Sequence, residues 1–436
     1  MRRLALLLIL FAACSKKPAP APVAEPDSIA TPEGRARMLA LWKQEGGLPV
    51  DKDLARLQAL VQKQPEKLEA WIELGHLWIR KARDAQQPRL YANAGACADL
   101  VLARQPNNRP ALELQGLVLM NDHRFEEARA LMTKVLASTP DYPVALGTLS
   151  DADLELGRTK EAVEAAQRMM DLKPNLPSYS RAAHLQWLRG DVQGAKESLR
   201  LAIDAGNDGK DKEPKAWVMV QAAMLFWNEG DAEGAEAGFD ETLRWLPDFP
   251  PAQAGKARVL LGRGDGKAAA ALLEKAYQAN PLVETGWLLG DALELSGDAA
   301  GSERVRAEIE KRGRTTDPRT LALFWATRDR EHEAALKLAD AERKTRDDQY
   351  TEDVFAWALY RAGRLGEALA ASDKANALGT RDARLWFHAG AIRLAMGEGA
   401  KGQDLIRKAL ELNPHFDVAG EAEARRLLAA PMAKGK

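Results

Sequence analysis

Residues 216–247 decide the fold of this chain, and they read AWVMVQAAMLFWNEGDAEGAEAGFDETLRWLP. Apolar residues recur every three or four positions on each side of a central Gly-Asp pair, which is the spacing of amphipathic helices. Gly230 stands where the first helix would end on a left-handed residue. Ala235, five positions later, is small enough to let two helices approach closely, and Pro247 ends the second helix. The stretch therefore predicts a helical hairpin.

The glycine, the alanine five positions after it and the closing proline recur along most of the chain with a period of about 34 residues. A fixed period of this length indicates stacked supersecondary units, each of which buries its apolar face against its neighbours. We count about eleven units between residues 34 and 414, and residues 418–429 predict a last helix that caps the final apolar face. The prolines at this period are Pro106, Pro140 and Pro174, and then Pro247 and Pro281; the glycines followed five positions later by alanine are Gly157, Gly190, Gly230, Gly264 and Gly363.

This pattern resembles the tetratricopeptide repeat (TPR) family, in which positions 4, 8, 11, 20, 24, 27 and 32 of each unit have preferred residues. Residues 216–247 match it with Ala223, Phe226, Ala235, Phe239 and Pro247. The resemblance implies an all-α fold, a right-handed superhelix of about eleven hairpins whose concave surface binds proteins or peptides.

Two units depart from the pattern, at about 283–315 and 316–348, because they lack the terminal proline. The first also has Ser302 where the family prefers alanine. They could form a joint between two sub-arrays, and we expect their many basic residues to lie on a solvated face.

Composition excludes several classes of protein. The 436 residues carry a formal net charge of −1, so no strong field attracts nucleic acid, and we predict no nucleic-acid partner. The two cysteines, Cys14 and Cys97, cannot build a disulfide framework, and we expect Cys97 to be a buried small hydrophobe. Phosphate-binding loops and the common hydrolase and metalloprotease motifs are absent from the sequence, so we predict no catalytic residues, no bound metal and no cofactor.

The N-terminal residues 1–13 read MRRLALLLILFAA and have the two arginines and the short apolar run of a targeting segment. Followed by Cys14, they resemble a bacterial lipoprotein signal, with Phe11 where leucine is more usual. The resemblance implies that Cys14 becomes the acylated N-terminus, and Ser15 after it suggests the outer membrane. The alternative is an ordinary secretory signal with an incidental cysteine.

The remaining segments outside the repeats are a tether and a tail. Residues 14–33 are rich in proline and alanine and predict an extended tether that holds the folded part away from the membrane. The superhelix is expected to span residues 34–430, and residues 431–436 to be a disordered tail.

The concave surface can be located by helical geometry. Positions 4, 8 and 11 of each first helix face the core, and positions 2, 5, 9 and 12 form a second stripe about 100° away, which lines the concave face in the family. Aromatic residues in a partly polar groove are typical of binding hot spots. The alternative is that they pack against the neighbouring helix or fill a narrow superhelix. The candidate groove residues are Trp187, Trp217, Trp227, Trp287, Asp291, Phe324, Trp357, Tyr360 and Phe387.

Three functions remain open on the sequence. The first is a scaffold anchored to the outer membrane and facing the periplasm, which binds an envelope protein and assists a motility, pilus or secretion complex. The second is a glycan-binding lipoprotein of an uptake system, because tryptophans also stack on sugars. The third is an enzyme hidden in the units that depart from the pattern. The chaperone-binding type of TPR uses Lys and Asn at positions 5 and 9 to hold a terminal carboxylate, and those slots hold other residues here, such as Asp353 and Trp357.

Overall fold

The computed structural model describes residues 30–43, 46–85, 87–206 and 211–430. Within these ranges the chain forms 23 α-helices, one short 3-10 helix and no strand, so the predicted all-α solenoid is confirmed. Cys14 with its signal segment, most of the tether and the tail lie outside the described residues. None of the helices in the described part combines the length and the apolar composition that a membrane crossing requires.

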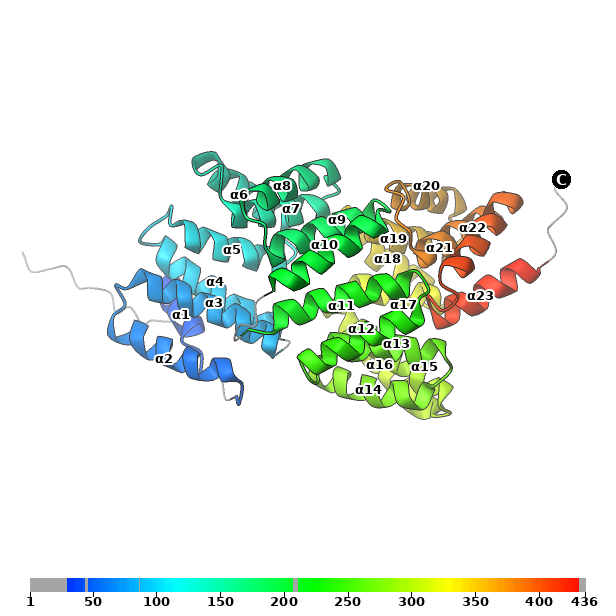
Figure 1. The fold of residues 1–436 in the computed structure, drawn as a ribbon, viewed down its shortest axis with the longest axis horizontal. Coiled ribbons are helices and arrows are strands. Elements are labelled where there is room, and N and C mark those ends of the chain that lie inside the picture. Colours follow the sequence, from blue (N-terminus) through cyan, green and yellow to red (C-terminus); the bar gives the residue numbers. More distant parts are fainter. Residues whose placement is uncertain (1–29, 44–45, 86, 207–210, 431–436) are drawn as a thin grey trace, which may run out of the picture.

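Ten consecutive helical hairpins make up the body of the molecule (Figure 1). Their first helices are α3 (Leu68–Asp84), α5 (Arg109–Asn121), α7 (Pro143–Glu155), α9 (Leu176–Leu188), α11 (Glu213–Asn228), α13 (Pro250–Gly262), α15 (Val283–Leu295), α17 (Pro318–Thr327), α19 (Gln349–Arg361) and α21 (Ala383–Ala395). Their second helices are α4 (Tyr91–Leu102), α6 (Phe125–Ser138), α8 (Thr159–Leu172), α10 (Val192–Ala205), α12 (Ala232–Trp245), α14 (Gly266–Ala279), α16 (Ala299–Thr316), α18 (His332–Glu342), α20 (Leu365–Ala375) and α22 (Gly399–Leu412).

The two ends of the array are built differently from its body. At the N-terminal end, α1 (Pro32–Ala40) packs mainly against α4, and α2 (Pro49–Lys63) packs against α3. The short helix η1 (Pro88–Leu90) lies in the longer connection between α3 and α4. At the C-terminal end, α23 (Val418–Ala429) packs on α22 and α21, which is the capping helix that the sequence predicts.

The repeated glycines and alanines have the structural roles that the sequence predicts, at the ends of the first helices and between the two helices of each hairpin. The five glycines end their first helices with φ between +71° and +80°, the left-handed region in which glycine has no Cβ penalty. In the hairpin of α17 and α18, which lacks this glycine, Asp329 takes the left-handed conformation instead, with φ of 54°. The matched alanines, such as Ala195 and Ala235, are fully buried between the two helices of their hairpins. Small side chains here allow the close helix packing on which each unit depends.

The two units that depart from the repeat pattern do not form a joint. The largest hydrophobic core runs from Ala257 to Ala424 and passes through both of them without a break. Their basic residues are also not uniformly solvated, because Arg306 contacts a buried carboxylate and Arg319 lines an inner cavity. The expectation of a joint is therefore corrected: these units belong to the same continuous array as their neighbours.

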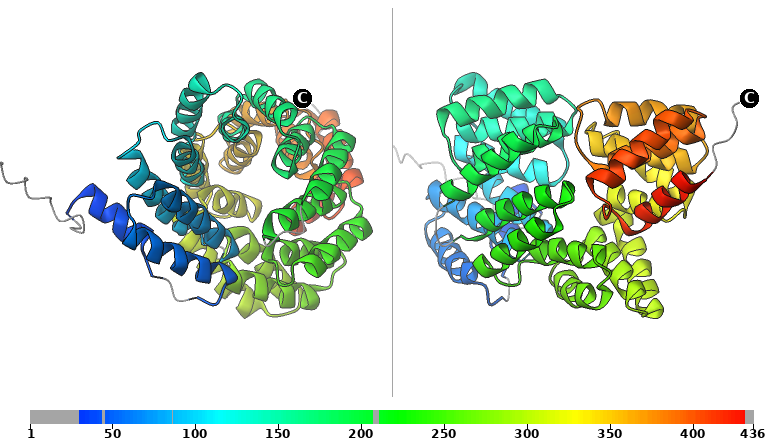
Figure 2. Two further views of the ribbon diagram at one scale, coloured as in Figure 1. Left: turned by 60° about the vertical axis from the view of Figure 1, so that its left-hand side comes forward. Right: turned by 45° about the vertical axis from the view of Figure 1, so that its right-hand side comes forward.

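The hairpins wind into a superhelix whose successive turns touch (Figure 2). Three backbone carbonyls at the ends of α7, α9 and α11 accept hydrogen bonds from loops that lie one superhelical turn later in the chain. The first two bonds join residues 192 positions apart and the third joins residues 186 apart. We call this line of contacts the seam; Asp347 N donates to Glu155 O at 2.8 Å, Thr380 Oγ1 donates to Leu188 O, and Asn413 Nδ2 donates to Trp227 O at 2.7 Å.

The seam can be tested with two glycines that share a backbone conformation. Gly190 has φ of +75° and Gly264 has φ of +79°. A Cβ on Gly190 would lie 2.6 Å from the carbonyl oxygen of Gly379, across the seam, whereas a Cβ on Gly264 would meet no atom within 4 Å. We expect Gly264→Ala to lower the free energy of unfolding by about 1–2 kcal/mol, the cost of a left-handed alanine, and Gly190→Ala to lower it further.

Urea unfolding followed by circular dichroism measures both variants. Amide hydrogen exchange separates the two effects, because only Gly190→Ala should accelerate exchange in residues 379–382 on the far side of the seam. Equal exchange in both variants would show that the seam does not order that loop.

Candidate functional site

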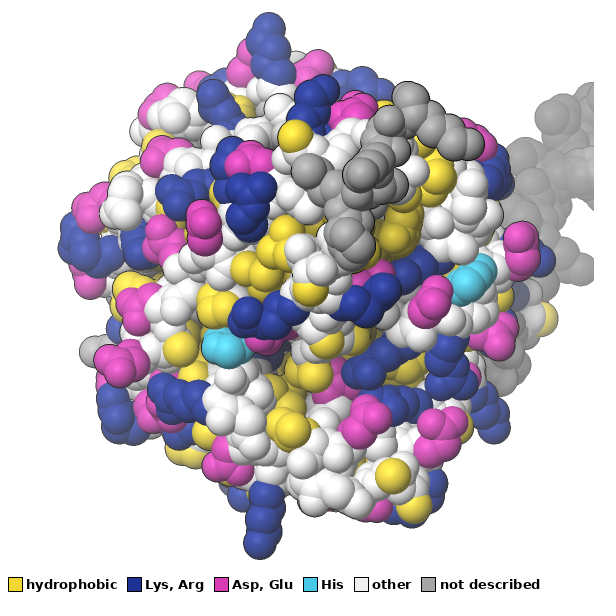
Figure 3. Space-filling view, turned by 90° about the vertical axis from the view of Figure 1, so that its right-hand side faces the viewer, with side chains coloured by type: hydrophobic (Ala, Val, Ile, Leu, Met, Phe, Trp, Pro, Cys, Tyr) yellow, Lys and Arg dark blue, Asp and Glu magenta, His cyan; other side chains and the backbone are white. Residues whose placement is uncertain are grey.

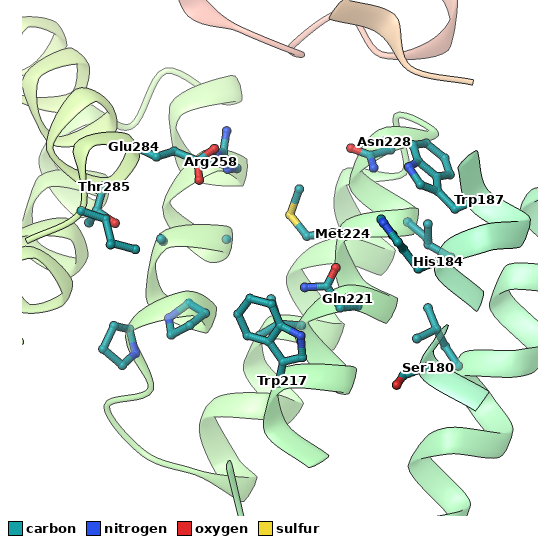
Figure 4. A pocket seen from close by; sticks show the side chains of 18 of the residues that line it. Ser180, His184, Trp187, Trp217, Gln221, Met224, Asn228, Arg258, Glu284 and Thr285 are labelled. Atoms are coloured by element: carbon teal, nitrogen blue, oxygen red, sulfur yellow. The ribbon is translucent and has the colours of Figure 1, made fainter. Parts of the chain in front are cut away.

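The inner surface of the superhelix, which we call the lumen, contains a cavity of about 400 Å³. Its walls come from α9, α11, α13 and α15, whose side chains His184, Trp217 and Arg258 are among those labelled in Figure 4. Tyr350 of α19 also lines the cavity. Much of the lining is apolar, and we call this part the apolar lobe, after Trp217, Met224, Pro250, Pro251 and Leu282.

Helix α11 presents the second stripe of its sequence to this cavity. Trp217, Val220 and Met224, at positions 2, 5 and 9 of the unit, all line it. The Trp217 side chain is 49% exposed, an unusual state for the largest apolar residue type. Gln221 and Asn228 also line the cavity, and neither side chain makes a hydrogen bond within the described part of the chain. The cavity thus offers one accessible indole ring and two amides with unused donors and acceptors.

The nine predicted groove residues divide into two groups. Trp187 and Trp217 line the cavity described above, and Trp227 and Trp287 line a second cavity beside it. The other five line none of these cavities; they are Asp291, Phe324, Trp357, Tyr360 and Phe387. Four of them, all except Tyr360, are buried, so their predicted groove position is corrected, whereas Tyr360 is partly buried and its groove position stays a prediction.

The corrected aromatic residues pack on one another. Trp357 is fully buried and stacks between Tyr360, with ring centroids 4.8 Å apart, and His388, with centroids 4.1 Å apart. Phe387 meets Trp357 edge to face, and Phe324 meets Trp287 in the same way, both at 5.4 Å. Such pairs add to burial in stabilising a core. The alternative that the sequence left open, aromatic residues packing against the neighbouring helix, therefore holds for Trp357 and Phe387 on α19 and α21.

Asp291 is also a core residue. It is buried in α15, where Arg306 donates to its carboxylate at 3.1 Å and Arg328 makes a second hydrogen bond. Burial raises the pKa of Asp291 to about 6, against the influence of both arginines. Its partners are thus within its own protein, and it presents no free charge to the lumen.

The second cavity, of about 320 Å³, joins the first and is more polar. Both cavities are lined by Met224, Asn228, Arg258, Glu284 and Tyr350, so they are two parts of one inner space. We call the second part the charged lobe, after Arg258, Glu284, Arg319, Asp382 and Arg384. Figure 3, which looks onto the end of the molecule near α23, shows hydrophobic side chains at the centre of this face among Lys and Arg.

Three arginines surround one carboxylate in the charged lobe. Arg258 donates to Glu284 at 2.5 Å, and the pKa of Glu284 is lowered by Arg258 first and then by Arg384 and Arg319. Glu284 nevertheless keeps 57% of its side chain exposed to the lumen. The lobe is therefore a cavity in which charges from α13, α15, α17 and α21 act on one another.

His184 lies between the apolar lobe and the seam. Its ring is open to lumen water, but protein surrounds it on the other sides, and this enclosure lowers its pKa. Asp151 and Asp348 oppose the shift. The effect of Asp151 is limited because Arg181 holds it in a two-bond ion pair at 2.6 and 2.9 Å.

Sequence reasoning missed the charged residues of the lumen. Arg258 follows Met224 by one 34-residue period and so occupies position 9, and Glu284 and Arg384 occupy position 2 of their units. The signal was available, since these positions belong to the stripe used to select aromatic residues. Charged residues on that stripe predict lumen positions as well as aromatic residues do.

Comparison with known families identifies the repeat. Residues 119–186 match the family model for the tetratricopeptide repeat. This segment, from the end of α5 into α9, is a tetratricopeptide repeat segment. The helical array also resembles a solved tetratricopeptide repeat protein from Parabacteroides merdae, at 13% identity and a TM-score of 0.38, over 67% of this chain and 99% of that one.

Two curated bacterial proteins are similar in sequence. Cellulose synthase operon protein C of Pseudomonas fluorescens is 28% identical over 258 residues, which is 56% of this chain and 19% of that protein. Cytochrome c-type biogenesis protein CycH of Pseudomonas aeruginosa is 28% identical over 152 residues, which is 34% of each. The chain thus spans about a fifth and a third of the length of these relatives.

The environment of His184 predicts its titration. A histidine whose folded pKa is below the unfolded value of about 6.5 binds fewer protons in the folded state. Stability is then fully present above pH 6.5 and is lost as the pH falls below it. Titration of the ring by NMR should give a midpoint below 6.5, and His184→Gln should flatten the loss of stability below that pH. A midpoint at or above 6.5 would contradict the enclosed environment.

Proposed function

We propose that this protein is a scaffold of the bacterial cell envelope, anchored to the outer membrane by lipid on Cys14 and facing the periplasm. It holds an extended segment of a protein partner in the lumen and assists the assembly or work of an envelope complex. It acts by binding, and the proposal requires no catalytic group and no cofactor.

The observation that carries the proposal is the half-exposed Trp217 beside the free amides of Gln221 and Asn228. An accessible indole in a concave site is the kind of side chain that anchors a partner. Amide groups with unused donors and acceptors suit the backbone of an extended peptide, which has one donor and one acceptor per residue. A cavity of about 400 Å³ accommodates side chains, not a folded domain.

The similar proteins support an envelope role in general terms. The names of the two relatives refer to a cellulose synthase operon and to cytochrome c-type biogenesis, and both proteins come from Pseudomonas species. The resemblance of residues 1–14 to a lipoprotein signal adds the anchor. The identity of the captured partner will distinguish between a motility, a pilus and a secretion complex.

Glycan binding is the second candidate, and Trp217 is the observation that favours it. A flat indole with amides nearby also suits a sugar ring, and one relative is named for a cellulose synthase operon. Binding of soluble glucans that quenches tryptophan fluorescence and is lost in Trp217→Ala would favour this candidate over the first.

The binding role of the lumen can be tested with two matched tryptophans. Trp217 is 49% exposed and lines the apolar lobe, whereas Trp42, after α1, is 50% exposed and lines neither lobe. In crosslinking and affinity capture from the native envelope, we expect Trp217→Ala to reduce the recovery of a defined set of envelope proteins at least tenfold, the loss of a hot-spot side chain. Trp42→Ala should recover them like the wild type. Equal recovery by all three proteins would exclude the apolar lobe as the binding surface.

The anchor can be tested with the two cysteines. Cys14→Ser should abolish incorporation of a palmitate analogue and move the protein from the membrane to the soluble envelope fraction, because each buried CH₂ of an acyl chain contributes about 0.8 kcal/mol to membrane binding. Cys97→Ala is the control, since Cys97 is fully buried in the array and should leave labelling unchanged. A wild-type protein that takes up no label would favour an ordinary secretory signal.

A further inference from the structure

The charged lobe contains an arginine whose guanidinium forms no hydrogen bond with its own protein, although the nearby carboxylates of Asp382, Asp353 and Glu284 raise its pKa. Arg384 lines the lobe from the first turn of α21, and its guanidinium makes no hydrogen bond or ion pair within the described ranges. Its Nε is buried without a hydrogen-bond partner. A buried donor without a partner carries a free-energy cost, so a ligand that accepts from Arg384 recovers part of that cost.

The acidic residues near Arg384 and Arg319 are already engaged elsewhere. Asp382 caps α21, where its Oδ1 accepts from the backbone N–H groups of Arg384 and Leu385. Asp348 caps α19 in the same way, and its contacts to Arg319 are long, at 3.4 and 3.5 Å. Carboxylates that cap helices are held in place by backbone N–H groups. Arg319 Nη1 is held by long contacts to Asp348 and by Thr351 Oγ1 at 3.3 Å, which leaves its other nitrogens, and the whole Arg384 guanidinium, available to an incoming anion.

The position of these arginines is fixed by the rest of the lumen. Arg258 and Glu284 lie on the boundary between the two lobes, and both line both cavities. Glu284 is held by Arg258 at 2.5 Å, which leaves the side of the lobe near α17 and α21 for Arg319 and Arg384. A chain that places an apolar side chain near Trp217 can continue past this boundary into the charged lobe.

We propose that the charged lobe binds an Asp or Glu side chain of the partner segment, through Arg384 and Arg319, while an apolar side chain of the same segment fills the apolar lobe. The inference rests on the proposed function, and it adds the chemistry of the partner. A planar guanidinium binds a carboxylate through paired hydrogen bonds, which gives both affinity and orientation. The acidic group is an internal side chain, so the segment needs no free C-terminus in the lumen.

The experiment selects binders from a phage-displayed library of random dodecapeptides against the full-length protein in detergent. We expect the selected peptides to contain an apolar residue and an Asp or Glu at a fixed separation from it. For a selected peptide measured by fluorescence polarisation, Arg384→Gln should weaken binding about tenfold or more. Changing the peptide's acid to its amide should weaken it equally, and the two changes together should cost no more than one alone.

The matched control is Arg407→Gln, on the second helix of the same hairpin, outside the lumen. It should bind like the wild type. Arg384 makes no hydrogen bond but interacts with the charges of Asp382, Asp353 and Glu284, so we expect Arg384→Gln to lower the melting temperature slightly and to keep the circular dichroism spectrum of the folded protein, which separates lost binding from lost folding. Arg384→Lys tests the paired geometry, since it retains the charge but not the fork, and should bind with intermediate affinity.

The outcomes separate the two proposals. Peptides without an acidic preference, or equal binding to Arg384→Gln, would overturn the acidic-segment inference, and loss of binding in Trp217→Ala would then leave the proposed function standing. A selection that yields no binder, or binders indifferent to both variants, would overturn both. Non-additive effects of Arg384→Gln and of the change in the peptide's acid would support both the proposed function and the acidic-segment inference.

Discussion

The seam is the interaction on which the shape of the lumen depends. In a stack of helical hairpins each hairpin contacts only its nearest neighbours, so the curvature of the stack is the sum of small rotations between successive hairpins. Small variations in these rotations add up along the chain. Here the carbonyl of Leu188 receives a hydrogen bond from Thr380, and that of Trp227 receives one from Asn413. A separation of 192 residues corresponds to about five and a half repeats of 34 residues. The seam thus fixes how many hairpins surround the lumen and how wide the lumen is.

A lumen of fixed width explains why its two lobes differ. The apolar lobe lies among α9, α11 and α13, where the walls leave the Trp217 ring accessible. In the C-terminal hairpins, Trp357 and Phe387 occupy the inner side and pack on each other, so the space there is closed by the protein's own rings. The charged lobe lies between these regions and contains Arg384, whose guanidinium makes no hydrogen bond or ion pair within the described residues. The groups available for binding therefore lie between the hairpins that leave the lumen accessible and the C-terminal hairpins, whose aromatic side chains pack on one another.

Most of the fold could be predicted from sequence because its determinants are local. A glycine such as Gly230 and an alanine such as Ala235 specify a hairpin within a few residues of themselves, and the 34-residue period specifies the stack. The candidate site could be predicted only in part. Helical numbering placed Trp217 and Trp357 on equivalent stripes, and the structure exposes the first and buries the second. That difference is set by contacts between units and between turns, which no single repeat encodes.

The seam also has a mechanical consequence. A superhelix whose turns do not touch extends under load like a spring, because small rotations between hairpins add up to a large change in length at little cost in free energy. In this protein the turns are joined at Glu155, Leu188 and Trp227, so lengthening requires these contacts to break first. The molecule therefore resists axial pulling as a stiff cylinder up to a threshold force, and yields only when the seam opens.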